Sequence, residues 1–220
     1  MAQTQTEGYL ASPGSKGGPG VLVLHPWWGL TGDIKDFCDR LAGEGFIAYA
    51  PDLFRGKLAN TIEEAEALVG EMNAENDRME KVITGAVDLL WGRLQPGDRR
   101  LGVVGFSFGA AYALWLSGED PERVSAVVVF YGTGDGDFDR ARASYLGHFA
   151  EIDPYETPES VAWLESALKD AGRSLTLYNY KGVGHWFCEP GRPDAYNEPA
   201  DRLAWERTLA FLNSNLKPGS

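Results

Sequence analysis

The segment Gly105-Phe106-Ser107-Phe108-Gly109 has the spacing of a turn that presents a nucleophilic serine. Glycines two residues before and two residues after the serine leave room where a Cβ atom would collide with neighbouring backbone. An apolar run, Leu101–Val104, precedes the motif and a helical pattern, Ala110–Leu116, follows it, so the serine would stand on a sharp strand-to-helix turn. The N–H of Phe108 would then face the site as an oxyanion donor. For this motif alone, a glycine-rich turn without chemistry remains the alternative.

A serine hydroxyl needs a base, and the sequence has three histidines to supply one. Where a nucleophilic serine stands on such a turn, the acid and then the histidine follow it in the chain, which excludes His25. His148 lies within a predicted strand, where a structural hydrogen-bonding role suits it better. His185 follows the run Leu175–Tyr180, at the carboxyl end of a predicted strand, where parallel sheets place their ligand sites. We therefore predict His185 as the general base.

The carboxylate that orients this histidine must lie between the serine and the histidine, in a loop after a strand. Asp153 follows the predicted strand Tyr145–Phe149, and the turn-forming pair Asp153-Pro154 would fix its position. We predict Asp153 as the acid and keep Glu151 as the alternative. The aspartates of the glycine-rich segment Gly132–Asp139 also follow a strand. That segment is the best candidate for a mobile surface loop, and a gate over the site is one hypothesis for it.

A second oxyanion donor is expected from the loop after an earlier strand. The run Val21–His25 ends at Pro26, which has no N–H, so Trp27 is the first residue that can donate. Further aromatic side chains flank the same motifs, namely Trp28, Trp186 and Phe187. We expect them to line an apolar pocket for a small uncharged substrate, with core packing as the alternative for each.

Apolar, β-rich runs that alternate with amphipathic segments would position these residues. The predicted strands cover residues 21–25, 46–50, 100–105, 124–130, 145–149 and 175–180. The predicted helices cover residues 33–45, 61–73, 77–94, 110–116, 157–171 and 200–216. This alternation predicts an α/β fold with a single, mostly parallel twisted sheet and helices on both faces. We expect one domain over residues 8–216 after a flexible tail at residues 1–7.

Composition bounds the class of protein. Of 220 residues, 44% are hydrophobic and 24% are charged, which is ordinary for a globular chain. The net charge of −12 disfavours nucleic acid and anionic membrane surfaces as partners. The two cysteines form no metal-binding spacing, and the first residues carry no apolar signal segment. We therefore expect a cytoplasmic enzyme, a monomer or a homodimer, that needs no metal or cofactor.

Several motifs together carry a resemblance to a known family. They are His-Pro-Trp-Trp-Gly-Leu (25–30), Ala-Pro-Asp-Leu (50–53), Gly-Phe-Ser-Phe-Gly-Ala (105–110), Asp-Pro-Tyr (153–155), Gly-His-Trp-Phe (184–187) and Trp-Glu-Arg-Thr-Leu-Ala-Phe-Leu (205–212). In this order the chain resembles the dienelactone hydrolase family, of α/β-hydrolase fold. The resemblance implies a hydrolase of esters or lactones without a large cap domain. It also implies Ser107, Asp153 and His185 as the triad, with Trp27 and Phe108 as backbone oxyanion donors.

The chain departs from the founding members of that family at particular positions. They have a cysteine nucleophile where this chain has Ser107, and a glutamate before the oxyanion donor where it has Pro26. The two changes fit together, because a serine needs no thiol-activating carboxylate. Founding members hold a carboxylate-bearing lactone with arginines, one shortly after the histidine, where this chain has Cys188 and Glu189. We therefore predict a serine esterase for a small uncharged ester or lactone. A thioesterase, an acylpeptide hydrolase and a non-catalytic binding protein of this fold are the alternatives.

Overall fold

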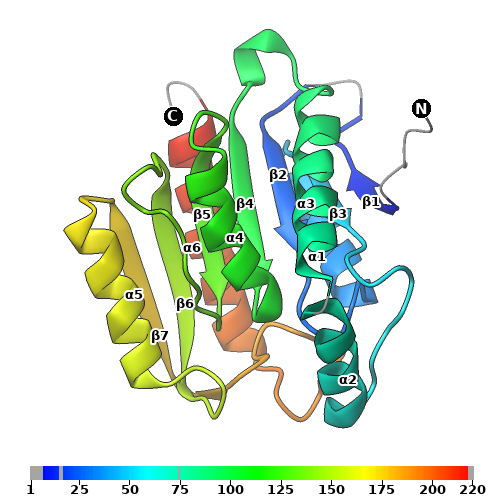
Figure 1. Ribbon diagram of the computed structural model, residues 1–220, viewed down its shortest axis with the longest axis vertical. Coiled ribbons are helices and arrows are strands. Elements are labelled where there is room, and N and C mark those ends of the chain that lie inside the picture. Colours follow the sequence, from blue (N-terminus) through cyan, green and yellow to red (C-terminus); the bar gives the residue numbers. More distant parts are fainter. Residues whose placement is uncertain (1–6, 15–16, 74, 218–220) are drawn as a thin grey trace. The chain divides into compact units, whose positions relative to one another are not determined.

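The computed structural model describes residues 7–14, 17–73 and 75–217. The chain forms two compact units that divide between Arg99 and Arg100, and each unit contains strands and helices (Figure 1). Residues 1–6 of the predicted flexible tail lie outside the described residues. The carbonyl of Glu7 accepts a hydrogen bond from the N–H of Asp52 at 2.8 Å. The predicted extent of the domain, residues 8–216, stays a prediction.

The first unit contains a sheet in which β3 lies between β1 and β2. Its strands are β1 (Gly8–Ala11), β2 (Gly20–Leu24) and β3 (Ile47–Pro51). Its helices are α1 (Gly32–Gly43), α2 (Ile62–Asn73) and α3 (Asn76–Trp91), followed by the short 3-10 helix η1 (Pro96–Asp98). β3 pairs antiparallel with β1 and parallel with β2. The sequence did not predict β1, because it is only four residues long and two of these are exposed.

The second unit contains parallel strands in the order β4, β5, β6, β7. These strands are β4 (Leu101–Phe106), β5 (Val124–Phe130), β6 (Ser144–Ile152) and β7 (Leu175–Gly184). The helices are α4 (Phe108–Glu119), α5 (Pro158–Asp170) and α6 (Glu198–Leu216). α4 and α5 cover one face of this sheet and α6 covers the other (Figure 1). Because the strands are parallel, their carboxyl ends meet at one edge.

β4 and β5 form the core of the second unit. Every residue of β4 is buried, and Ser125 is the one residue of β5 that is not fully buried. Such continuous burial is typical of parallel strands covered on both faces. The rings of Phe106 and Phe130, at the carboxyl ends of the two strands, stack with centroids 4.6 Å apart. The segment that follows Phe106 therefore starts from a firmly packed base.

The helices are mostly amphipathic and bury one face. α1 buries Ile34, Phe37, Cys38 and Leu41, the set that its sequence periodicity predicts. α4 differs, because most of its residues are buried. Among the described residues, no helix is long and apolar enough to cross a membrane.

Candidate active site

Ser107 stands alone between β4 and α4, at the carboxyl end of a buried strand. Its backbone angles, φ 46° and ψ −113°, are rare for a residue with a side chain. A Cβ atom on Gly105 would lie 2.5 Å from the carbonyl oxygen of Gly109 and 2.6 Å from Cα of Ala110. The turn therefore requires glycine at position 105. Strain of this kind is concentrated at functional sites, where the surrounding structure maintains it.

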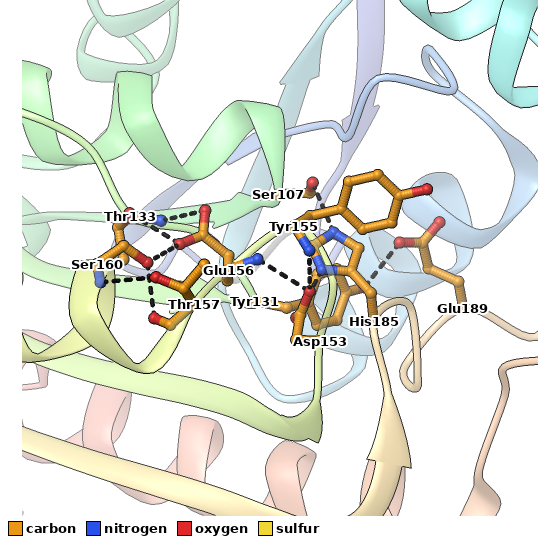
Figure 2. A network of polar contacts seen from close by, with 10 residues as sticks. All are labelled: Ser107, Tyr131, Thr133, Asp153, Tyr155, Glu156, Thr157, Ser160, His185 and Glu189. Carbon is orange, nitrogen blue, oxygen red and sulfur yellow. Dashed lines mark hydrogen bonds and ion pairs between the residues drawn. The ribbon is translucent and has the colours of Figure 1, made fainter.

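The structure brings Ser107, His185 and Asp153 together (Figure 2). Oγ of Ser107 lies 2.8 Å from Nε2 of His185, and Nδ1 of His185 lies 2.7 Å from Oδ2 of Asp153. The side chains of His185 and Asp153 are only 3% and 2% exposed. Each residue follows a strand of the second unit: β4, β6 and β7. The arrangement has the geometry of a nucleophile, a base and an orienting acid.

The loop after β6 holds the Asp153 carboxylate in place. Its Oδ1 atom accepts hydrogen bonds from the N–H of Tyr155 at 2.9 Å and from the N–H of Glu156 at 3.0 Å. Burial on its own would raise the pKa of Asp153. The contact with His185 and the two backbone donors outweigh burial, so the pKa lies below its usual value. Asp153 is therefore ionised at neutral pH.

The other two histidines have structural partners. His148 is buried, with Nδ1 2.8 Å from the Tyr180 hydroxyl and Nε2 2.9 Å from Oγ1 of Thr208. Burial, with a smaller contribution from Arg207, lowers its pKa to about 3. In the first unit, Nε2 of the buried His25 accepts the N–H of Leu53 at 3.1 Å. The structural role predicted for His148 agrees with these contacts.

Glu151, the alternative acid, has a different partner. Its carboxylate is exposed and accepts the N–H of Gly182 at 2.8 Å. The carboxylate in contact with His185 is that of Asp153.

The segment 132–139, the hypothetical gate, packs closely on α4. A Cβ atom on Gly134 would lie 2.6 Å from Cα of Ala111, and one on Gly136 would lie 2.8 Å from the carbonyl oxygen of Leu114. Thr133 also bonds to Glu156 through both its N–H and its hydroxyl. This packing argues against a freely moving gate.

The predicted oxyanion donors lie where the sequence places them along the chain. Phe108 is the first residue of α4, directly after the serine, and its ring packs on Tyr112. Trp27 lies in the first unit, in the turn after β2, and is half-buried. The N–H of Gly29 closes that turn on the carbonyl of Pro26, at 3.1 Å. The donor roles of Trp27 and Phe108 stay predictions.

The structure corrects two of the predicted pocket residues. Trp28 is 2% exposed and Phe187 is fully buried, so both pack in the core and offer a substrate almost no surface. The ring of Phe187 packs between those of Tyr131 and Tyr180, with centroids 5.5 and 4.9 Å away. An aromatic residue next to a motif can face the core or the site, and the sequence does not show which. Trp186 is half-buried and its ring lies 5.1 Å from that of His185.

The sequence places Glu189 shortly after the histidine, but it does not show the contacts that Tyr131 and Tyr155 make with His185. The rings of Tyr131 and Tyr155 lie 4.8 and 5.0 Å from its imidazole. Tyr131 is buried at a φ of 37°, and its hydroxyl donates to Oε1 of the buried Glu189 at 2.7 Å. These contacts join residues far apart in the chain, and no local pattern marks them. The one signal in the sequence is nearness to the triad: Tyr155 comes two residues after Asp153, and Glu189 comes four residues after His185.

A groove of about 420 Å³ begins beside His185. The side chains that give it an apolar character include Ile152, Pro154, Tyr155, Trp186 and Tyr196. Ile152 is 65% exposed and Tyr155 is 42% exposed. Asp194 and Asn197 also line this groove, so its walls are both polar and apolar. Among the described residues, no group of three His, Cys, Asp or Glu side chains is arranged to hold a metal ion.

Known sequences match nearly the whole chain. The sequence profile of the dienelactone hydrolase family matches residues 6–216. This chain belongs to the dienelactone hydrolase family. The protein usf of Aquifex pyrophilus is 32% identical, over 96% of this chain and 94% of the relative. A candidate carboxymethylenebutenolidase of Aquifex aeolicus is 30% identical, over 97% of this chain and 95% of the relative. The predicted family is thereby confirmed.

A solved structure shows the same fold. It is the crystal structure of a candidate dienelactone hydrolase from Klebsiella pneumoniae, with a TM-score of 0.75 and 24% identity. The likeness covers 93% of this chain and 91% of the other. It confirms the predicted α/β-hydrolase fold. Membership in the family makes the protein a hydrolase of ester bonds, as predicted.

Proposed function

We propose that Ser107 attacks the carbonyl carbon of a small ester or lactone and forms an acyl-enzyme. The observation that carries this proposal is the continuous contact from Oγ of Ser107, through both nitrogens of His185, to the Asp153 carboxylate. A serine hydroxyl becomes nucleophilic near neutral pH when an adjacent, oriented base can take its proton. The buried, ionised Asp153 would stabilise the imidazolium that results.

The reaction would proceed in two halves. In the first, Nε2 of His185 takes the proton of Ser107 as Oγ bonds to the carbonyl carbon. The N–H groups of Phe108 and Trp27 would stabilise the oxyanion. His185 then returns the proton to the leaving alkoxide, which in a lactone remains part of the acyl group. In the second half, His185 takes a proton from water as the water attacks the acyl carbon. The bond to Oγ of Ser107 then breaks, and His185 returns the proton to Oγ.

The electrostatics favour an uncharged substrate. Glu189 is a buried carboxylate bonded to Tyr131, whose ring packs on His185. The whole chain carries a net charge of −12. A substrate carboxylate near this side of His185 would therefore meet like charge in a poorly screened environment.

Labelling with a fluorophosphonate tests the mechanism. We expect one adduct, mapped by mass spectrometry to Ser107, and strongly reduced labelling in His185→Ala. The folded Ser107→Ala variant is the control and should give no adduct. An adduct on another residue, or labelling of His185→Ala at the wild-type rate, would overturn the assignment.

A substrate panel tests the class of substrate. We expect p-nitrophenyl acetate and a neutral lactone to be hydrolysed faster than the anionic p-nitrophenyl hemisuccinate. Glu189→Gln should narrow that difference, because it removes the buried negative charge. A clear preference for an acyl thioester or an N-acylated peptide would favour the thioesterase or the acylpeptide hydrolase instead.

A further inference from the structure

A second route joins Ser107 and Asp153 without passing through His185, and Figure 2 shows its part from Thr133 through Glu156 to Asp153. Oε1 of Glu156 accepts the N–H of Thr133 at 3.1 Å, and Oε2 accepts the Thr133 hydroxyl at 2.8 Å. The N–H of the same Glu156 donates to Oδ1 of Asp153 at 3.0 Å. One residue therefore contacts both the catalytic carboxylate and the loop that follows β5.

That loop packs directly against the nucleophile. A Cβ atom on Gly132 would lie 2.6 Å from the carbonyl oxygen of Ser107 and 3.0 Å from its Cα. The N–H of Ser107 also donates to the carbonyl of Phe130 at 2.9 Å. Thr133, the partner of Glu156, is the next residue after this contact. The contacts therefore close a ring that runs from Ser107 through the β5 loop and Glu156 to Asp153, and back through His185.

Glu156 is itself held firmly. Oε2 also lies 2.9 Å from the Ser160 hydroxyl, which shares its one proton between this carboxylate and the carbonyl of Thr157. Thr157, the next residue, caps α5 by accepting the N–H of Ser160 at 3.2 Å. A carboxylate just before a helix N-terminus is also favoured by the helix dipole. With three donors on its carboxylate, the side chain has little freedom to move.

We propose that Glu156 is a positioning residue that fixes the separation of Asp153 from Ser107. It contacts no reacting atom. It would keep the acid and the nucleophile in register while the histidine between them gains and loses a proton. The inference rests on the proposed function, because the separation matters for rate only if the triad acts. A misplacement of about 1 Å in such a site costs about 100-fold in rate.

Variants of the ring give the test. We expect Glu156→Ala to lower kcat for p-nitrophenyl acetate by about 10- to 100-fold with an unchanged KM. Glu156→Gln should lose less, because its amide oxygen keeps an acceptor for Thr133. Thr133→Val, which removes the hydroxyl contact and keeps the N–H contact, should lower kcat less than Glu156→Ala does, and adding it to Glu156→Ala should cost little more, because both act on the same link. Glu159→Gln, an exposed glutamate three residues further on in the first turn of α5, is the matched control and should retain wild-type kcat.

Two readouts separate positioning from simple stability. A displaced Asp153 supports the imidazolium less well, so the acid limb of the kcat profile should move to lower pH in Glu156→Ala. The low-field proton resonance of His185 Nδ1 should also shift or broaden, and this signal needs no turnover. If wild type hydrolyses no ester and the resonance still responds, the proposed function fails and the positioning role stands. If kcat and the resonance match the Glu159→Gln control and only unfolding changes, the inference is overturned.

Discussion

Replacing Asp153 by asparagine is expected to force His185 into the wrong tautomer. Oδ1 of Asp153 accepts the N–H groups of Tyr155 and Glu156, while Oδ2 faces Nδ1 of His185 at 2.7 Å. An asparagine of the same shape must turn its carbonyl oxygen toward the two N–H donors, because an NH2 group cannot accept from them. The NH2 group then faces Nδ1, which must accept and can carry no proton. The proton moves to Nε2, so Ser107 loses its base.

The expected loss is large. We expect kcat for p-nitrophenyl acetate to fall by about 10³- to 10⁴-fold, by analogy with other serine triads. This corresponds to about 4–5.5 kcal/mol of transition-state stabilisation. KM should be nearly unchanged, because Asp153 contacts His185 and not the substrate in the proposed mechanism. The rate of fluorophosphonate labelling at Ser107 should fall with kcat.

The control is Glu151→Gln, which removes a carboxylate that also accepts a backbone N–H but does so away from His185. This variant should keep wild-type kcat. The tautomer argument would be refuted if kcat fell by less than about tenfold in Asp153→Asn, or by more than about tenfold in Glu151→Gln.

Three further predictions concern stability and are measured by urea unfolding. Gly105→Ala should destabilise the protein by about 1–3 kcal/mol, since its Cβ atom would collide with backbone, whereas Gly70→Ala, with open space around it, should not destabilise it. Because burial holds the pKa of His148 at about 3, the unfolded chain binds a proton at a higher pH than the folded protein does. The free energy of unfolding should therefore fall as pH drops below about 6.5, and this group should contribute about 2 kcal/mol of that loss at about pH 5. If the free energy of unfolding depends on pH as steeply in His148→Gln as in wild type, this prediction is contradicted. Tyr131→Phe should cost about 1.5–3 kcal/mol, because it removes the hydroxyl that donates to the buried Glu189, and an unchanged free energy of unfolding would contradict this.

The triad could be located from the sequence because each member stands at a marked position. Ser107 lies between paired glycines at a change from strand to helix. Asp153 precedes a proline, and His185 comes late in the chain after an apolar run. The chain order then excluded His25, and the position of His148 within a predicted strand left His185. Strand ends were predicted less exactly. β7 extends to Gly184, four residues past its predicted end, because its last four residues include one apolar side chain, that of Val183, and give no apolar run.

The supporting residues could not be located in the same way. Glu156 and Thr133 are 23 residues apart, and Tyr131 and Glu189 are 58 apart. Neither pair has a spacing that a helix or strand would repeat, so only the folded chain brings them together. The pocket roles predicted for Trp28 and Phe187 were wrong for a related reason. Phe187 and Trp186 are neighbours, and the positive φ of Trp186 turns the chain there, so the two side chains meet different surroundings.

The parallel sheet of the second unit explains why the site needs both kinds of residue. β4, β6 and β7 are each followed directly by a triad member, whereas β5, which lies between β4 and β6, is followed by Tyr131. Tyr131 supplies no catalytic atom in the proposed mechanism, yet its ring packs on His185 and the loop after it packs on Ser107. Ser107 and Asp153 therefore follow two strands, β4 and β6, that are separated by β5. The residues at the end of β5 must hold the serine and the acid at the correct distance. Glu156, in the loop after β6 that carries the acid, bonds to Thr133 in the loop after β5. It therefore links the ends of these two neighbouring strands.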